Sequence, residues 1–327
     1  MGKKNQVSTN SEMGEDTVMV TGGSGFIGRQ FVPFLAESGH SVVSMYHMRL
    51  PDPFPKVFPV CSDLGSTELL AAPLRGVKTV VYLSWQSNFM ASADEIRFEP
   101  NNSRSSPNVK LLNNLLRAME KAGTERIIFV SAVGANRRAR STFLKEKYLG
   151  EVAVLNSKVP EKIIVRSNIV FSANTASDQF IRSIMNVMKF PGFYPVPKVD
   201  NKVAPVHISD FNMILKDLVE YEMSDSSAIV EVSGSEELKV EDVFRIISDK
   251  YASGSRFQLR GSLGDSLVPI FERRGEFYTA LGPKIRDFLA IGNLKDFNTE
   301  TDNPLLNLLP KNKKGFKEAL KLSLIHI

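Results

Sequence analysis

The stretch from Thr17 to Gly28 constrains this chain more than any other part of the sequence. A run rich in β-branched residues, Thr17–Thr21, leads into a turn with glycines at positions 22, 23, 25 and 28, and apolar residues at helical spacing follow from residue 29 to residue 38. A strand, a glycine-rich turn and a helix in this order are typical of a site for the pyrophosphate of a dinucleotide.

Each glycine of the turn has a physical role in that interpretation. Gly22 and Gly23 let the chain reverse, Gly25 leaves room for the pyrophosphate, and Gly28 lets the helix pack closely against the strand. The phosphates are expected at the helix N-terminus, where free N–H groups and the macrodipole favour an anion. The alternative is a turn without a ligand. The predicted cofactor contacts in the turn are Gly22, Ser24, Gly25, Phe26, Ile27 and Gly28.

Strands and helices alternate after this turn. Strands are expected at residues 41–46, 57–60, 79–84 and 126–131, and helices at residues 66–74 and 109–122. Sustained alternation predicts an α/β fold with a doubly wound parallel sheet of the Rossmann type. Residues 17–321 are assigned to it, with a small C-terminal lobe built from about 178–198 and 257–320. The proline-rich segment 190–197 is expected to lack regular structure.

The end of the second strand indicates which dinucleotide is bound. A free ribose 2′-hydroxyl is usually met by an acid about 20 residues beyond the glycines, whereas a 2′-phosphate requires a cation. Here the strand is followed by His47, Met48 and Arg49, and no acid precedes Asp52. We therefore expect NADP(H) in preference to NAD(H), with Arg49 as the phosphate partner; a solvated loop arginine is the alternative.

Composition limits the partners of the chain. Its 327 residues are 43% hydrophobic and 24% charged, with a net charge of +5, which is ordinary for a soluble globular protein. Two basic runs, Arg137–Arg140 and Lys311–Lys314, lack aromatic companions, so we expect solvated loops and no nucleic-acid partner. The single cysteine, Cys61, excludes an internal disulfide and fits a reducing compartment or an organelle matrix; we expect it to be buried and unreactive.

The termini and the hydropathy of the chain are less specific. No apolar run reaches the length of about 18 residues that spans a bilayer, so we expect no membrane span and leave peripheral association open. Residues 1–16 are polar and poor in targeting signals, which predicts a disordered tail. Residues 322–327 match the translation of an adaptor used in sequencing libraries, and we interpret them as an artefact.

The turn Thr21–Gly28 resembles the first turn of the short-chain dehydrogenase/reductase superfamily, in its extended or atypical branches. The resemblance implies that Asp63 and Leu64, after the third strand, contact the adenine; Asp63 can also cap the helix expected after it. Ser84 and Trp85 end the fourth strand, which places them beside the cofactor in a doubly wound sheet. Core packing is an equal alternative for Trp85.

The same resemblance identifies the catalytic positions. In this superfamily a serine after the fifth strand orients the substrate, and a Tyr-x-x-x-Lys helix exchanges the proton and binds the nicotinamide ribose. Ser131 stands at the serine position, Lys147 at the lysine position and Phe143 at the tyrosine position. Tyr148 lies on a different face of the helix. The resemblance thus implies ribose binding by Lys147 without tyrosine-based turnover; a surface lysine is the alternative.

Residues 143–151, 163–171 and 178–180 resemble, more closely, the family of the nucleotide-binding accessory subunit of respiratory complex I and its bacterial relatives; residues 203–210 and parts of 293–310 resemble it as well. Departures are Phe143, Ser172 where a glycine usually follows the sixth strand, and the lack of a clear presequence. The resemblance implies a structurally held nucleotide, complex I subunits as partners, and a place on the matrix side of the mitochondrial inner membrane; otherwise a cytoplasmic or organellar protein is expected.

His207 and Asp210 invite a catalytic interpretation, but a structural one is favoured. Asp210 is expected to cap a helix over residues 211–221, and His207 to end a strand. No cluster of His, Cys and carboxylates has the spacing of metal ligands, so no metal is expected.

Three functions compete. The first is an NADP(H)-binding protein that holds its cofactor structurally in a larger assembly. The second is an active NAD(P)H-dependent reductase or a sugar-nucleotide epimerase or dehydratase with another proton donor. The third is a redox-sensing regulator that responds to NADP(H) occupancy.

Overall fold

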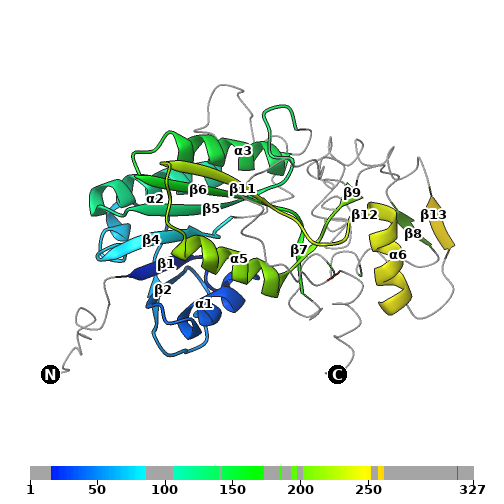
Figure 1. Ribbon diagram of the computed structural model, residues 1–327, viewed down its shortest axis with the longest axis horizontal. Helices are drawn as coiled ribbons and strands as arrows, with labels where there is room; N and C mark the ends of the chain where they lie inside the picture. Colours follow the sequence, from blue (N-terminus) through cyan, green and yellow to red (C-terminus); the bar gives the residue numbers. More distant parts are fainter. Residues whose placement is uncertain are drawn as a thin grey trace.

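Seven parallel strands form the central sheet of the protein, in the order β11-β6-β5-β4-β1-β2-β3 (Figure 1). The computed structural model describes residues 16–85, 106–139, 142–172 and 202–251, with short pieces at 181, 185, 193–196, 257–260 and 315. The strands are β1 (Thr17–Thr21), β2 (Val42–Tyr46), β3 (Val57–Cys61), β4 (Val77–Tyr82), β5 (Arg126–Ala132), β6 (Glu161–Ser167) and β11 (Ser227–Val232). The order reverses between β1 and β4, which places a ligand crevice at their carboxyl ends.

Helices cover both faces of this sheet. Figure 1 shows α1 (Gly28–Glu37) and α5 (Ile208–Glu220) on one face, and α2 (Pro107–Ala122) and α3 (Thr142–Leu155) on the other. The expected doubly wound α/β fold of the Rossmann type is confirmed.

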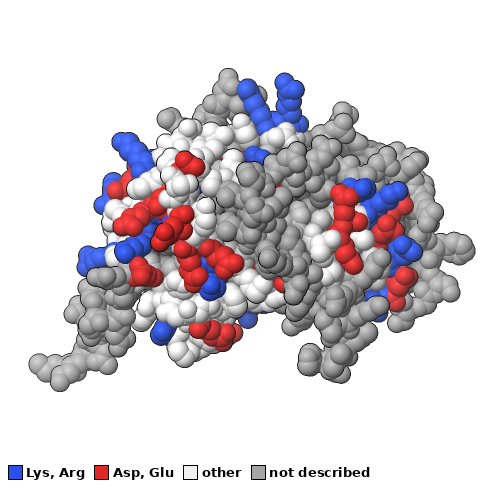
Figure 2. Space-filling view, in the orientation of Figure 1, with Lys and Arg blue, Asp and Glu red and all other residues white. Residues whose placement is uncertain are grey.

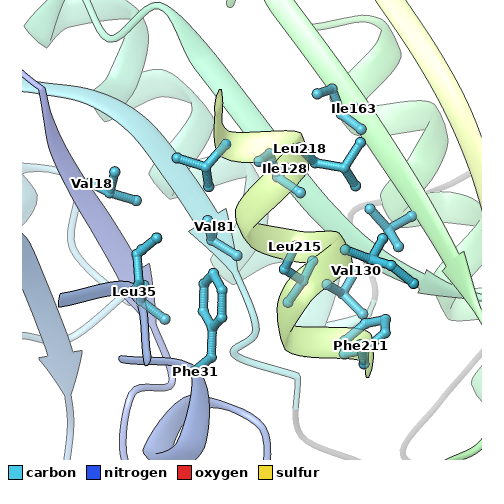
Figure 3. Close-up of a cluster of buried hydrophobic side chains, with 14 of the residues drawn as sticks. Val18, Phe31, Leu35, Val81, Ile128, Val130, Ile163, Phe211, Leu215 and Leu218 are labelled. Carbon is cyan, nitrogen blue, oxygen red and sulfur yellow. The ribbon is translucent and has the colours of Figure 1, made fainter. Parts of the chain in front are cut away.

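The pleat of β1 divides the core into two layers. Val18 and Val20 point into the layer under α1 and α5, whereas Met19 points into the layer under α2 and α3, as the two-residue period of a strand requires. Figure 3 shows the first layer, in which aromatic and aliphatic side chains of two helices meet strand residues: Phe31, Leu35, Phe211, Leu215, Leu218, Val18, Val81, Ile128, Val130 and Ile163. The central strands are therefore buried on both faces.

Local capping explains where α2 begins and ends, and the predicted helix is confirmed. Ser106 is the N-cap and its Oγ accepts a hydrogen bond from the Val109 amide at 3.4 Å, while Pro107 occupies the first turn. Gly123 ends the helix in the left-handed conformation, with φ of 72°.

The helix predicted over residues 66–74 is wrong, because only a 3₁₀ turn at Glu68–Leu70 forms there. Pro73 has no amide hydrogen and its ring would clash with the preceding turn of an α-helix. Asp63 consequently caps no helix; its Oδ1 accepts a hydrogen bond from the Gly65 amide at 2.8 Å, which is an Asx turn.

The capping role predicted for Asp210 is also wrong. α5 begins at Ile208, and its N-cap is His207, whose side chain accepts a hydrogen bond from the Ser209 amide at 3.3 Å. Asp210 lies in the first turn, where the helix dipole favours an acid, and accepts from Ser209 Oγ at 3.2 Å. His207 ends β10 (Val206–His207), as predicted.

Cys61 is exposed, contrary to the expectation that it is buried. It ends β3, which is the outermost strand of the sheet in the described part of the chain and pairs there with β2. Side chains of an edge strand have fewer neighbours than those of a central strand, so an apolar run in the sequence does not ensure burial there.

Further strands pair outside the main sheet. They are β7 (Val170–Phe171) with β10, β9 (Lys202–Val203) with β12 (Leu238–Lys239), and β8 (Phe193–Val196) with β13 (Phe257–Arg260); helix α6 covers Val240–Tyr251. β8 contradicts the irregular structure predicted for 190–197. Proline is tolerated in an edge strand, and Pro195 lies in a strand with one described neighbour. The rest of the predicted lobe, and residues 1–15 and 322–327, lie outside the described residues, and the lobe stays a prediction.

The face drawn in Figure 2 carries basic and acidic side chains side by side over the described residues. Within the ranges that the structure describes, no helix has the combined length and apolar character that crossing a membrane requires.

Candidate functional site

The glycine turn lies at the carboxyl end of β1 and is fixed to both neighbouring strands. On one side the Gly23 amide donates to the Met45 carbonyl of β2 at 3.1 Å. On the other side Thr21 Oγ1 accepts from the amides of Leu83 and Ser84 beyond β4, each at 3.2 Å. The turn thus stands at the point where the strand order reverses, and Ser84 lies beside it; contact of Ser84 with a cofactor stays a prediction.

Two glycines are required by the shape of the turn. Gly22 has a φ of +68°, and a Cβ there would lie 3.1 Å from both the amide nitrogen and Oγ of Ser84. A Cβ on Gly28 would overlap the Gly22 carbonyl oxygen and press on the backbone of Gly23. Gly25 differs, because it is exposed and an added Cβ would meet only the Gly22 oxygen, at 3.1 Å. Its small size is therefore not needed for packing.

Backbone donors of the turn are open. The amides of Ser24, Phe26 and Ile27 have no hydrogen-bond acceptor within the described part of the chain. The N-terminus of α1 has no side-chain cap, and its first turn holds no acid. These amides lie just before the N-terminus of α1, where the helix dipole favours an anion. These residues fit a pyrophosphate, the group that the sequence predicts there.

Arg49 lies three residues beyond the end of β2 and is exposed. It has no hydrogen-bond or ion-pair partner among the residues that the structure describes. Met48 and Leu50 on either side are 91% and 58% exposed. This end of the crevice therefore combines a cation with apolar surface, which suits a phosphorylated adenosine.

Asp63 and Leu64 follow β3, the strand next to β2, so they lie near the end of β2 that leads to Arg49. Asp63 is exposed. Leu64 is buried in the core layer under α2, and Asn114 of that helix donates from Nδ2 to its carbonyl at 3.0 Å. Of the two residues, Asp63 is the one open to a ligand.

Ser131, predicted to orient a substrate, has its hydroxyl bound inside the protein. It lies in β5, is buried, and donates from Oγ to Glu151 Oε1 at 2.5 Å. A hydroxyl has one hydrogen to donate. While it binds Glu151, Ser131 can only accept hydrogen bonds from another group.

Glu151 belongs to a charge network that no local sequence pattern predicted. Arg166 of β6 binds its carboxylate with two donors, at 3.0 and 2.8 Å, and lies 3.6 Å from Glu231 of β11. Ser131, Arg166 and Glu231 stand side by side in the strand register, with Glu151 of α3 above them. Burial raises the pKa of the Glu231 carboxyl. The only signal in the sequence was a charged residue inside each of two apolar strands.

Lys147 is 5% exposed, and its ammonium is also bound inside the protein. Nζ donates to the Val130 carbonyl at 2.8 Å and lies 5.7 Å from the centre of the Phe143 ring. Burial lowers the pKa of Lys147 to about 7, against the opposing effect of Glu146 and Glu151. Phe143 and Lys147 do meet on one helix face, as predicted, but the lysine is turned into the protein.

Glu146, beside Lys147 on α3, is committed to a different element. Its carboxylate accepts from Ser106 Oγ at 2.6 Å and from Asn108 Nδ2 at 3.1 Å. The two residues begin α2, so Glu146 fixes α2 to α3 on this face of the sheet.

Trp85 follows Ser84 and packs as core as well as lying at the crevice. Its ring is edge-on to Phe129 of β5, with centroids 5.6 Å apart, and its centroid lies 4.1 Å from Lys147 Nζ. The indole Nε1 is buried without a hydrogen-bond partner in the described part of the chain. No group of His, Cys, Asp and Glu side chains suited to a metal ion occurs among the described residues.

Residues 22–182 match the model of the NAD(P)H-binding family. A 3-beta-hydroxysteroid dehydrogenase from Mycolicibacterium neoaurum is 33% identical over 116 residues, 35% of this chain and 31% of that protein. The mitochondrial NADH dehydrogenase [ubiquinone] 1 alpha subcomplex subunit 9 of Dictyostelium discoideum is 25% identical over 265 residues, 79% of this chain and 72% of that protein. The chain therefore spans less than a third of the first relative.

The fold is also shared with solved structures. A nucleoside-diphosphate-sugar epimerase from Staphylococcus aureus superposes with a TM-score of 0.68 at 14% identity, over 93% of this chain and 99% of that one. The protein has an NAD(P)-binding Rossmann domain with an epimerase/dehydratase-like fold, and its homologues include a complex I subunit and a hydroxysteroid dehydrogenase.

Proposed function

We propose that this protein binds NADP(H) across its glycine turn and holds it as a structural element, without tyrosine-based turnover. The observation that carries the proposal is the contrast in hydrogen bonding along the crevice. The amides of Ser24, Phe26 and Ile27 have no acceptor in the described residues, whereas Ser131 and Lys147 have protein partners. The crevice is equipped to bind a nucleotide and lacks a free proton donor at the family's catalytic positions.

Arg49 supports the choice of NADP(H) over NAD(H), since it is an exposed cation just beyond the end of β2 with no partner among the described residues. A charge-assisted contact with a 2′-phosphate is worth about 1.5–3 kcal/mol. Arg49→Ala should therefore weaken NADPH binding about tenfold or more and change NADH binding little, as measured by calorimetric titration.

Arg75 provides the matched control. It is exposed and lies just before the start of β4, at the opposite end of the sheet. Arg75→Ala should leave both dissociation constants unchanged. An equal loss of NADPH and NADH affinity in Arg49→Ala would contradict the assignment of the 2′-phosphate.

The likeness to a complex I subunit supports a place in an assembly. The Dictyostelium relative is aligned over 79% of this chain. We propose a peripheral position on respiratory complex I, on the matrix side of the inner membrane. Native electrophoresis of solubilised mitochondria should show the protein migrating with NADH dehydrogenase activity; migration as a free monomer would contradict this proposal.

The likeness to a hydroxysteroid dehydrogenase, 33% identical over 116 residues, favours a second candidate, an active NAD(P)H-dependent oxidoreductase or a sugar-nucleotide epimerase or dehydratase. A panel of carbonyl substrates and nucleotide sugars distinguishes the two functions. Steady NADPH oxidation or sugar conversion by the unmodified protein would establish the enzyme and overturn the structural role.

A further inference from the structure

The two sides of β1 offer different surfaces to a dinucleotide. Arg49 and Asp63 lie beyond β2 and β3, on the side where an adenosine ribose is recognised in this fold. The other half of the ligand must then extend from the glycine turn over β4 and β5. The first side chain beyond Ser84 on that path is Trp85.

Trp85 is fitted into the wall of the crevice. A Cβ on Gly150 of α3 would lie 3.1 Å from the indole Cη2 and 2.7 Å from Phe129 Cζ, so this glycine provides the space that the two rings fill. The indole also lies edge-on to Phe129 and packs against the core layer under α2 and α3. Contacts with two elements fix the ring in this position.

The position of the indole determines what Lys147 can reach. Nζ has a carbonyl on one side, at 2.8 Å, and the Trp85 ring on another, with the centroid at 4.1 Å. The rings of Phe129 and Phe143 lie 5.3 and 5.7 Å from it. Lys147 is 5% exposed, and the indole is the nearest of the three rings that surround its ammonium.

We propose that Trp85 separates Lys147 from the nicotinamide end of the crevice, so that the site recognises the adenosine diphosphate half of its ligand. The inference rests on the proposed nucleotide binding and adds the ligand class. An adenosine 5′-diphosphate nucleotide with a 2′-phosphate should bind about as tightly as the whole dinucleotide. The nicotinamide and its ribose contribute little, because the residue that would hold them is covered.

Calorimetric titration of the full chain with 2′-phospho-ADP and with NADPH tests this directly. In the native protein the two dissociation constants should agree within about threefold. In Trp85→Gly, the dissociation constant of NADPH should be at least about tenfold lower than that of 2′-phospho-ADP, because the ammonium becomes accessible to two ribose hydroxyls. The double variant Trp85→Gly/Lys147→Met should return to the native ratio. A parallel comparison of ADP with NADH removes any dependence on the 2′-phosphate.

The outcomes separate the two proposals. A native preference for NADPH of tenfold or more, unchanged in Trp85→Gly, would overturn the role of Trp85 and leave nucleotide binding intact. If the native protein binds none of the four nucleotides, the proposed function is overturned, and this inference with it.

A second measurement needs no variant. Trp85 is the only tryptophan of the chain, so its fluorescence reports on this position alone. Saturation with NADP⁺ should leave the emission maximum in place, because the indole stays packed. A shift to longer wavelength would show that the ligand displaces the indole into water and would overturn the proposal.

Discussion

The two halves of the crevice use the same edge of the same sheet in opposite ways. At the glycine turn, the amides of Ser24, Phe26 and Ile27 have no acceptor among the described residues. At β5 and α3, Ser131 donates to Glu151 and Lys147 donates to a backbone carbonyl. In this fold, nucleotide binding and proton transfer depend on separate sets of donors. One set can stay open to a ligand while the other becomes part of the protein interior.

A physical reason distinguishes the two sets. The amides of Ser24, Phe26 and Ile27 belong to the turn that precedes α1, where no neighbouring strand or helical turn of the described chain aligns an acceptor with them, so these donors do not depend on which side chains surround them. Side chains can instead pair with each other, and in α3 a buried glutamate lies within reach of both the serine and an arginine. Phe143 has no hydroxyl, so its ring cannot hydrogen-bond Lys147, whose ammonium donates to the Val130 carbonyl instead.

We call the region of Ser131, Lys147, Glu151 and Arg166 the closed half of the crevice. The largest effect is expected when one partner is removed from it. The Glu151 side chain is 3% exposed, and Arg166→Met leaves its buried carboxylate without the arginine that binds it through two donors. Removing one partner of a buried pair costs about 3–5 kcal/mol. Urea unfolding at neutral pH should show a loss of free energy of unfolding in this range, with the slope unchanged.

The control for this substitution is Arg245→Met. Arg245 pairs with Asp242 at 2.7 Å but is 59% exposed, and exposed pairs contribute about 0–1 kcal/mol. If the two variants lost the same free energy, the closed half would not be a coupled network and the contrast between the halves would fail.

Gly25→Val disrupts nucleotide binding in the open half of the crevice, which is the glycine turn with the amides of Ser24, Phe26 and Ile27. A β-branched side chain would stand at the exposed position that the pyrophosphate approaches, and the loss of two charge-assisted hydrogen bonds should weaken NADPH binding about 100-fold or more. The fold should survive, since a Cβ there meets only the Gly22 oxygen at 3.1 Å. Titration calorimetry and thermal unfolding of one preparation measure both quantities.

Gly28→Ala is the comparison for Gly25→Val, because it is expected to affect the fold as well as binding. Its Cβ would overlap the Gly22 carbonyl oxygen, so thermal stability should fall together with binding. Unchanged NADPH affinity in a folded Gly25→Val variant would mean that the turn is structural only.

Lys147 makes stability depend on pH. Its pKa is lowered by burial from 10.5 to about 7, so between these values the unfolded chain holds a proton that the folded chain has released. The free energy of unfolding should therefore rise with pH, by up to about 1.4 kcal/mol per pH unit from this group, and should lose this dependence below pH 7. Lys147→Met should remove the rise.

The measurement is urea unfolding at several pH values above 7, for the native chain and for two variants. Lys158 is an exposed lysine, and Lys158→Met should follow the native pH dependence. Identical curves for the native chain and Lys147→Met would show that the ammonium is hydrated, which contradicts its closed environment.

The sequence was sufficient for the sheet and the turn because their signals are local. β1 alternates its side chains between two layers, and glycines 22 and 28 stand where the backbone needs them, so a pattern of single residues predicts both. The helix predicted over 66–74 failed because one residue, Pro73, outweighed a favourable apolar pattern.

The closed half could not be predicted in the same way. Ser131, Glu151, Arg166 and Glu231 come from four elements and meet only through strand register and the packing of α3. Cys61 was misjudged for a related reason, since burial depends on whether a strand lies at the edge of the sheet. Information of this kind is absent from any short stretch of sequence.

The central claim is that nucleotide binds the open half of the crevice and leaves the closed half undisturbed. Amide chemical shifts of isotope-labelled protein, recorded during titration with NADPH, measure both halves in one experiment. The account predicts large shifts at Ser24, Phe26 and Ile27 and little change at Ser131 and Lys147. Large shifts at Ser131 and Lys147, with the turn unaffected, would contradict it.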